Sequence, residues 1–344
     1  MARAVVPLAL ALALVLAACG VEAGRGTGPV RDAASVPSPA AGAAAEPAGE
    51  RPPGPYVRVI GTVQDGGLPH AGCTCERCDA ARRDPARRRL VASLAVVLPA
   101  SGRVILIDAT PDLHEQLDLL ADVRDAPAGV TDRAPVDGVL LTHAHVGHYL
   151  GLAFFGYESM HTRDLPVWCT PRMASFLREN GPWSLLVGRR NVELRETAPG
   201  EAVALGDGVT ARAVPAPHRD EYTDTVVWRL EGPNRTVFYV PDTDGWDAWD
   251  RPLPAVLAGV DVALLDATFY SLDELPGRRV EEIGHPLIAD TMDRLQAEVD
   301  AGRLDVRFIH LNHTNPALDP ESPAAREIAR RGYAVAAEGE EIGL

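Results

Sequence analysis

The 344-residue chain contains no lysine, so all 33 of its basic residues are arginine, and this bias alone carries no functional information. Basic charge is also scarce overall, and the net charge of -15 at pH 7 disfavours a nucleic-acid partner because nothing supplies a basic patch for phosphate. No stretch after the N-terminal twenty residues is apolar and long enough to span a bilayer. Internal repeats at the usual periods are absent as well. The remaining composition, 46% hydrophobic and 24% charged, is that of a globular domain.

The N-terminus has the pattern of an export signal. A short positive start ending at Arg3 precedes an apolar run over residues 4–16, which has the length of a signal-peptide core. The following Leu16-Ala17-Ala18-Cys19 resembles the bacterial lipobox, in which the cysteine is lipidated and becomes the mature N-terminus. We therefore predict a lipoprotein signal peptide over residues 1–18 and lipidation of Cys19. The alternative is an ordinary signal peptide with an incidental cysteine.

The segment after the signal predicts a tether. Residues 19–55 are rich in Ala, Gly, Pro and Ser and show no hydrophobic period, so they cannot bury enough surface to offset ordering entropy. We predict one domain over residues 56–344. It would lie outside the cytoplasm, anchored through lipid to a bacterial membrane, in the periplasm or at the cell surface.

Short apolar segments bounded by Gly, Pro or Asp alternate with helical segments in this domain. Strands are predicted over 57–63, 94–98, 104–107, 138–141, 167–170, 210–214, 226–230, 236–240, 262–265 and 306–310, and helices over 111–121, 146–156, 171–180, 286–301 and 323–330. Several of the helical segments begin with proline, which suits the first helical turn. The order of elements indicates a layered α/β architecture.

Three histidines follow the predicted strand 138–141. His143, His145 and His148 fall within six residues across a strand-to-helix turn, in a chain with only ten histidines. Single histidines are usually structural, but three imidazoles at this spacing can converge on one site. Imidazole suits Zn, Fe, Mn or Cu, so this pattern strongly indicates a metal.

A second cluster consists of cysteines. Cys73, Cys75 and Cys78 can place three thiolates around one tetrahedral zinc ion, with a fourth ligand from elsewhere. The alternative is a Cys75–Cys78 disulfide, which an oxidising compartment would permit. The Cys-x-Cys spacing of Cys73 and Cys75 favours the metal site over the disulfide. The isolated Cys169 is expected to be a buried apolar residue instead of a ligand.

The histidine motif and its flanking segments resemble the metallo-β-lactamase superfamily, whose signature is His-x-His-x-Asp-His after a strand. Further matches are an early strand ending in an aspartate, a strand-end histidine, a bridging aspartate and a final histidine, here Asp108, His218, Asp242 and His313. The resemblance implies an α/β fold, a four-layered αββα sandwich, with metals at one edge of the two sheets.

This resemblance also implies roles for individual residues. The first metal would be held by His143, His145 and His218, and the second by His148 and His313, with Asp242 between the two metals. Asp108 would orient the histidine loop through hydrogen bonds.

One position departs from the signature, because Gly147 stands where the signature has its aspartate. The second metal position therefore lacks a carboxylate. It is weak, empty, selective for another metal, or completed by a substitute such as Asp244. Zinc, iron and manganese all remain open for this site.

The cysteine motif narrows the resemblance. Gly61-Thr62-Val63-Gln64-Asp65-Gly66-Gly67 followed by Cys-x-Cys-x-x-Cys resembles the PQQ biosynthesis protein B family and the related phosphoribosyl cyclic phosphodiesterases. In that group the cysteines form a structural zinc site that a histidine from a late loop closes. The best match for that histidine is His285, in Gly284-His285-Pro286.

These features predict a hydrolase that acts on a small-molecule phosphodiester, lactone or other ester through water activated by a metal. Asp242 would orient the water, and His313 or a nearby group would protonate the leaving oxygen. Two alternatives are an iron-dependent oxidase or hydroxylase like PQQ biosynthesis protein B, and a non-catalytic lipoprotein that binds a metal or a ligand. The sequence does not select the substrate or the oligomeric state.

Overall fold

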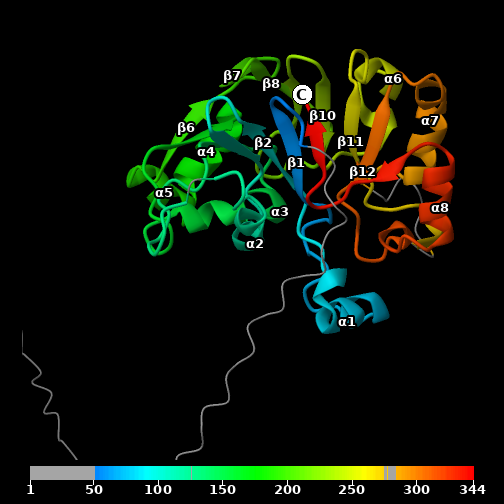
Figure 1. Cartoon of the computed structure of the whole chain (residues 1–344), viewed down its shortest axis with the longest axis horizontal. Coiled ribbons are helices and arrows are strands. Elements are labelled where there is room, and N and C mark those ends of the chain that lie inside the picture. The colour runs from blue at the N-terminus through cyan, green and yellow to red at the C-terminus, as the bar shows by residue number, and fades with distance from the viewer. Residues whose placement is uncertain (1–50, 125, 275–276, 278–283) are drawn as a thin grey trace, which may run out of the picture. The chain divides into compact units, whose positions relative to one another are not determined.

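The computed structural model describes residues 51–344 except 125, 275–276 and 278–283 (Figure 1). The predicted signal peptide over residues 1–18, the predicted lipidation site Cys19 and residues 20–50 of the predicted tether lie outside the described residues. The first strand begins at Tyr56. Among the described residues, no helix has the length and apolarity needed to cross a bilayer.

Two seven-stranded mixed sheets form the centre of the domain. The first has the order β14-β1-β2-β3-β4-β5-β6, with strands Glu341–Gly343, Tyr56–Gly61, Ser93–Leu98, Arg103–Ile107, Gly138–Leu140, Leu165–Cys169 and Val192–Glu196. The second has the order β13-β12-β11-β10-β9-β8-β7, with strands Ala334–Val335, Asp305–Ile309, Val262–Asp266, Thr236–Val240, Val226–Glu231, Val209–Pro215 and Ala202–Gly206.

Helices cover the outer faces of both sheets (Figure 1). The α-helices are α1 Glu76–Arg83, α2 Leu113–Asp118, α3 Val146–Tyr149, α4 Pro171–Glu179, α5 Trp183–Gly188, α6 Leu253–Val256, α7 Ile288–Asp300 and α8 Pro323–Arg330, and the short 3-10 helices are η1 Pro85–Arg87, η2 Leu150–Phe155, η3 Trp246–Ala248, η4 Leu272–Glu274 and η6 Pro316–Leu318. Residues of α2 to α5 pack on the first sheet, and residues of α6 to α8 pack on the second. The domain therefore has four layers.

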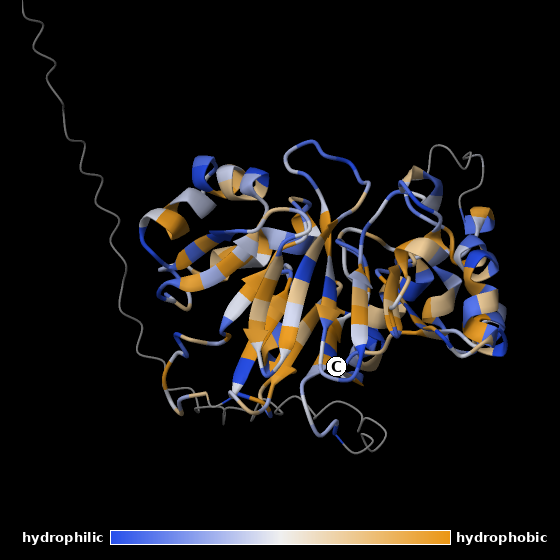
Figure 2. Cartoon of the chain, turned by 90° about the horizontal axis from the view of Figure 1, so that it is seen from above, coloured by the Kyte–Doolittle hydropathy of each residue, from blue (hydrophilic) through white to orange (hydrophobic). Residues whose placement is uncertain are grey.

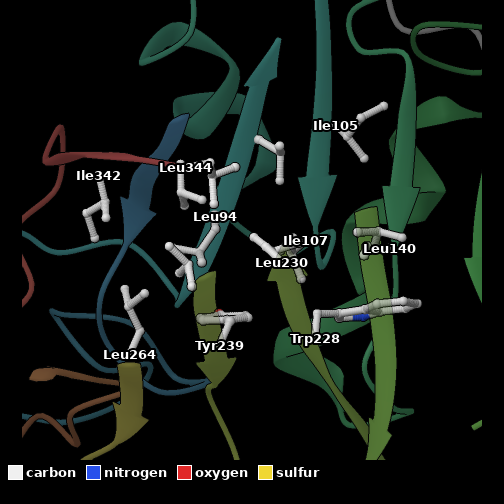
Figure 3. Packing of buried hydrophobic residues seen from close by; sticks show 14 of the residues in the cluster. Leu94, Ile105, Ile107, Leu140, Trp228, Leu230, Tyr239, Leu264, Ile342 and Leu344 are labelled. Atoms are coloured by element: carbon white, nitrogen blue, oxygen red, sulfur yellow. The ribbon is translucent and has the colours of Figure 1, made fainter. Parts of the chain in front are cut away.

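Alternation along the central strands explains this layering. In β3, Ile105 and Ile107 face the other sheet, whereas Val104 and Leu106 face the helices. Because successive side chains point to opposite faces, a strand buried on both sides reads as a continuous apolar run. Figure 3 shows side chains of both sheets, including Leu94 and Tyr239, meeting between the layers. In Figure 2 much of the central strands is accordingly orange, with paler and blue segments between.

Local signals set the helix starts. The hydroxyl of Thr170 accepts a hydrogen bond from the backbone N–H of Met173 at 3.2 Å, and Pro171 opens α4. The same arrangement, Ser322 followed by proline, opens α8. An N-cap hydroxyl satisfies one of the free N–H groups of the first turn, and proline there loses no bond.

The predicted α/β sandwich is confirmed, and the predicted strands match the central strands of both sheets. The sequence did not predict β6, β7, β13, β14, α1, α5 or α6. The predicted helix 146–156 is α3 followed by the 3-10 helix η2. Strand β6 was missed because it is a partly exposed strand at the edge of the first sheet, beside β5, and lacks an apolar run.

Candidate metal centre

Polar side chains gather at one edge of the two sheets, where several strands end. Strand β3 is parallel to β4, and β10, β11 and β12 are mutually parallel, so their carboxyl ends meet at a common edge within each sheet. Six residues stand at or just after these strand ends and the end of β8: Asp108, His143, His218, Asp242, Asp266 and His310. Strand ends from both sheets thus build the candidate metal centre.

The carboxylate of Asp242 lies at the centre of the first group of candidate metal ligands. Its Oδ2 lies 3.1 Å from Nε2 of His218, 3.3 Å from Nε2 of His143 and 3.7 Å from Nδ1 of His145. These four residues offer ligand atoms that lie within 4.8 Å of one another. Three imidazoles and one carboxylate at this spacing match the donor set of a zinc or iron ion. The structure thus brings together the four residues assigned to the first metal by resemblance.

Asp108 orients two of the imidazoles. Its buried carboxylate accepts hydrogen bonds from the backbone N–H of Thr142 at 2.8 Å and from Nδ1 of His148 at 2.7 Å. The Thr142 hydroxyl donates to the same carboxylate and lies 3.0 Å from Nδ1 of His143, from which it accepts. Each imidazole is therefore held through Nδ1, which leaves Nε2 as the nitrogen that can face a metal.

Asp266, in the second sheet, orients imidazoles as Asp108 does in the first. It accepts from the Thr268 hydroxyl at 2.8 Å and from Nδ1 of His285 at 2.9 Å. The Thr268 hydroxyl also lies 3.0 Å from Nδ1 of His310. Because backbone N–H groups of Thr243 and Thr268 occupy the remaining positions around its oxygens, Asp266 belongs to a hydrogen-bond network instead of a ligand set.

Unsatisfied buried atoms provide a test of whether a metal fits here. Within the described residues, Nε2 of His143, His148 and His310 and Oδ1 of Asp65 are buried and have no hydrogen-bond partner. Buried polar groups without a partner are costly, and all four point into one small region. Electron pairs on imidazole nitrogens and a carboxylate oxygen are what a divalent metal binds, so the residues present fit the metal that the fold implies.

The electrostatics of the centre favour a cation. Burial, together with the charge of His148, lowers the pKa of His143 to about 3, so its Nε2 is unprotonated at neutral pH. Burial would raise the pKa of Asp242, but the imidazoles of His143, His145 and His218 hold it well below its usual value. Burial alone would lower the pKa of His148, yet Asp108 raises it to about 9. A metal at its Nε2 would therefore displace a proton.

Two of the predicted histidines, His285 and His313, each lie in a different cluster from the one expected. His313 was assigned to the second metal and to proton transfer, and His285 to the cysteine zinc site; both assignments are wrong. His313 lies with Cys73, Cys75 and Cys78, whereas Nδ1 of His285 lies 3.3 Å from Oδ1 of Asp242. His310 directly follows β12 and takes the position expected of His313, while His313, three residues further along the chain, lies in the cysteine cluster.

The cysteine site is a separate cluster. The Sγ atoms of Cys73, Cys75 and Cys78 and a ring nitrogen of His313 lie within 4.8 Å of one another, and all three thiols are free. This Cys₃His set is a tetrahedral zinc arrangement. The backbone N–H of His70 donates to Sγ of Cys78 at 3.3 Å. Cys169 is buried in the helix-facing layer of the first sheet, as expected.

Two connecting segments serve both clusters. The segment after β1 carries Asp65 at the metal centre and then Cys73, and the segment after β12 carries His310 and then His313. Arg77 ties them together, since its guanidinium donates to the carbonyl of His313 at 2.9 Å and to that of Asn315 at 2.8 Å.

Asp244 does not complete the second metal position as suggested. Its Oδ1 lies 3.2 Å from Nδ1 of His218, so it orients the ring whose Nε2 faces Asp242. The carboxylate that lies near His148 and His310 belongs to Asp65, which sequence reasoning missed along with Asp266 and His310. The position of His310 immediately after a strand was the one signal that could have identified it.

A cavity of about 420 Å³ opens beside the centre. Its lining contains Asp65 and His145 from the metal centre, an aromatic wall of Tyr149, Phe176, Trp183 and Tyr222, and Arg219. Tyr149 packs against Trp183 with ring centroids 4.7 Å apart, so this wall is preformed.

The chain matches the model of the beta-lactamase superfamily domain over residues 103–325. The sandwich and the clustered donors agree with that match, and the chain belongs to the metallo-β-lactamase superfamily. Within it, the chain is 30% identical over 320 residues to coenzyme PQQ synthesis protein B from Cupriavidus necator, with 84% of this chain and 99% of that protein covered. A protein of the same name from Pseudomonas putida is 27% identical over 311 residues, with 84% of this chain and all of that protein covered.

Solved structures show the same fold. Zinc-bound PqqB from Methylobacterium extorquens superposes with a TM-score of 0.68 at 22% identity, covering 84% of this chain and 100% of that one. A diphosphatase from the PhnP family gives a TM-score of 0.57 at 22% identity, covering 84% of this chain and 98% of that one.

Proposed function

We propose that this protein is a metal-dependent hydrolase of small anionic esters, with phosphodiesters as the preferred class over lactones and neutral esters. The observation that carries the proposal is the convergence of His143, His145, His218 and Asp242 beside an open cavity. A divalent metal at such a donor set lowers the pKa of water towards ~7 and polarises the oxygen of the bond under attack.

The chain's own residues supply orientation and proton transfer. Oδ2 of Asp242 is directed at three imidazole nitrogens. Its Oδ1 lies 3.3 Å from Nδ1 of His285, has no hydrogen-bond partner among the described residues, and would align a water for attack. His285 is 22% exposed and is held through Nδ1 by Asp266, so Nε2 is its free nitrogen. In place of His313, we assign His285 to protonation of the leaving oxygen.

The cavity supports the substrate class. Its aromatic wall offers flat apolar surface, and Arg219 offers a cation beside it. A phosphodiester with one aromatic or other flat substituent fits both features, because its charge would meet the guanidinium while its substituent packs on Tyr222 and Phe176. A neutral ester would pack on the aromatic wall but would gain no charge interaction with Arg219.

A substrate panel tests the proposal. The zinc-, manganese- and iron-loaded protein would be assayed with bis(p-nitrophenyl) phosphate, an acyl homoserine lactone and p-nitrophenyl acetate. We expect the phosphodiester to have the highest kcat/KM, and Arg219→Ala to raise its KM without changing that of the acetate. Arg303→Ala, at an exposed arginine outside the cavity lining, is the matched control. No turnover of any ester by the metal-loaded protein would refute the hydrolase.

A second candidate is an iron-dependent oxidase or hydroxylase. The similarity to coenzyme PQQ synthesis protein B favours it, and histidines with one carboxylate suit Fe(II) as well as Zn(II). Iron as the retained active-site metal, with oxygen consumption in the presence of a small aromatic substrate and no ester hydrolysis, would select this reading. The absence of both activities would leave a non-catalytic protein that binds a metal or ligand.

We also propose that Cys19 carries a lipid that anchors the protein to a bacterial membrane outside the cytoplasm. The apolar run over residues 4–16 and the small residues before Cys19 support it. Expression in a bacterial host should place the protein in the membrane fraction with incorporated palmitate, and Cys19→Ser should abolish the incorporation. Equal distribution of both forms in the soluble fraction would refute the anchor.

A further inference from the structure

We propose that Asp65 supplies the carboxylate of the second metal position, replacing a ligand that Gly147 cannot provide. The inference rests on the metal centre of the proposed function. It concerns which residue of this chain binds, independently of the reaction that follows.

Gly147 and Asp65 occupy one space. A Cβ atom built on Gly147 would lie 2.1 Å from Oδ1 of Asp65, 2.6 Å from its Cγ and 2.9 Å from its Cα. Non-bonded atoms do not approach one another so closely. The two shortest contacts are with the carboxylate of Asp65, whereas the contact with its Cα is only slightly too short and needs a small shift. An aspartate at 147 and the present position of Asp65 therefore exclude each other. The carboxylate of Asp65 lies where the side chain of residue 147 would begin.

Asp65 also has the neighbours that a ligand needs. Its Oδ1 lies 3.5 Å from Nε2 of His148 and 3.7 Å from Nε2 of His310, and all three atoms are buried without a hydrogen-bond partner within the described residues. Oδ2 of Asp242 lies 3.8 Å from the same nitrogen of His148. The second position thus has two imidazoles, one carboxylate of its own and a second carboxylate shared with the first position.

The distances fit ligands around a common ion better than an ordinary ion pair. Charge-assisted hydrogen bonds between nitrogen and oxygen are about 2.7–2.9 Å long. Donor atoms bound tetrahedrally at about 2.0–2.2 Å from zinc are separated by roughly 3.3–3.6 Å from each other. The separations of 3.5 and 3.7 Å around Asp65 are close to those between ligands of one zinc ion. The 2.7 Å between Asp108 and His148 is instead the length of a charge-assisted hydrogen bond.

The orientation of the rings supports the same assignment. His148 is held through Nδ1 by Asp108, and His310 lies with Nδ1 against the hydroxyl of Thr268. In both residues the nitrogen that remains is Nε2, which faces Asp65. A carboxylate placed only to neutralise a histidine would not need two rings that are both fixed on their far sides.

Metal binding to the purified full-length protein in detergent tests the proposal. The chelator-stripped protein would be titrated with Zn²⁺ and with Mn²⁺ alone, and stoichiometry and Kd would be read by calorimetry and elemental analysis. We expect two ions at the centre besides the one at the cysteines. Asp65→Asn, which keeps the size of the side chain, should weaken one of the two by about a hundredfold or more, which exceeds the 10–100-fold typical of residues that only orient ligands. Asp118→Asn, at an exposed aspartate on α2, is the matched control.

A double variant removes dependence on a single substitution. Gly147→Asp alone should bind the second ion poorly because the two side chains collide, and Asp65→Gly with Gly147→Asp should restore its affinity to within about tenfold of the original. Thermal melting would show that each variant is folded.

Unchanged affinity in folded Asp65→Asn, only one ion at the centre of the original protein, or a folded double variant without the second ion would each overturn the assignment. These outcomes are separate from the hydrolase proposal, since the titrations contain no substrate. Two ions with the predicted dependence on Asp65 but no ester hydrolysis would refute that proposal alone.

Discussion

The hydrogen bond between Asp108 and His148 gives the sharpest prediction about the metal centre. Asp108→Asn preserves size, and asparagine tolerates the left-handed backbone at this position, where φ is 68°. The new amide oxygen can still accept from the backbone N–H of Thr142. Its NH₂ group then faces Nδ1 of His148, whereas the carboxylate accepts a hydrogen bond from that nitrogen at 2.7 Å. His148 must shift its proton to Nε2, the nitrogen that faces the second metal position.

The expected loss of metal affinity can be bounded from the pKa of His148. Asp108 is the main cause that raises the pKa of His148 from 6.5 to about 9 despite burial. At about 1.4 kcal/mol for each pH unit, this corresponds to at most roughly 3.4 kcal/mol. Replacement of groups that orient metal ligands typically costs 10–100-fold in affinity, or about 1.4–2.8 kcal/mol. We therefore expect Asp108→Asn to weaken the metal held by His148 by one to two orders of magnitude.

Competition with a chelator of known affinity measures this loss. The ion at the cysteines serves as an internal standard that should not change. Asp244→Asn is a matched substitution, because Asp244 accepts from His218 at the longer distance of 3.2 Å and its side chain is 35% exposed. Its effect should fall on the first metal and be smaller. Equal metal affinities in Asp108→Asn and the original protein would refute the orienting role.

The other predictions concern the remaining clusters and the core. His313→Ala should lose the zinc of the cysteine site and expose Cys75 to thiol reagents, whereas His285→Ala should retain it, as elemental analysis of both variants will show; zinc loss in His285→Ala alone would restore the original assignment. Glu338 has its pKa raised by burial to about 7, so the folded state binds its proton more tightly than the unfolded chain. The free energy of unfolding should therefore fall as pH rises from about 4.5 to about 7, by at most about 3 kcal/mol and less because the side chain is partly exposed, and Glu338→Gln should flatten this part of the urea-unfolding profile. Leu264→Ala, fully buried between the sheets, should cost about 2–5 kcal/mol in the same assay, and a loss below about 1 kcal/mol would contradict the packing described.

The sequence predicted the fold well because its central strands are buried on both faces. Strands such as β3 and β10 appear as apolar runs. Each of β3, β8, β10 and β12 also ends within three residues of a polar residue that marks the sheet edge. Edge strands such as β6, with the sequence Val-Glu-Leu-Arg-Glu, lack that pattern. Short helices such as α5, which has only six residues, are too brief to show a hydrophobic period.

Site residues could be predicted where they directly follow a strand, but not where the path of a connecting segment determines their position. His143, His145 and His218 follow strands closely, and the structure brings them together. His310 and His313 differ only in how far they stand beyond β12, and three residues suffice to move a side chain from one cluster to another. Asp65 could not be predicted because its role depends on its proximity to Gly147, which is distant in the sequence.

We expect the two connecting segments that join the cysteine site to the metal centre to link metal binding at the two sites thermodynamically. Zinc bound at Cys73 and His313 would restrain the same segments that carry Asp65 and His310, so part of the entropy of ordering the second metal position would already be lost when the zinc binds. Because a coupling free energy is reciprocal, a metal at the centre would tighten zinc binding by the same factor. In an oxidising compartment, a disulfide between cysteines would break this linkage and lower the metal affinity of the centre from a distance. The redox state of the cysteines would then control metal binding at the sheet edge.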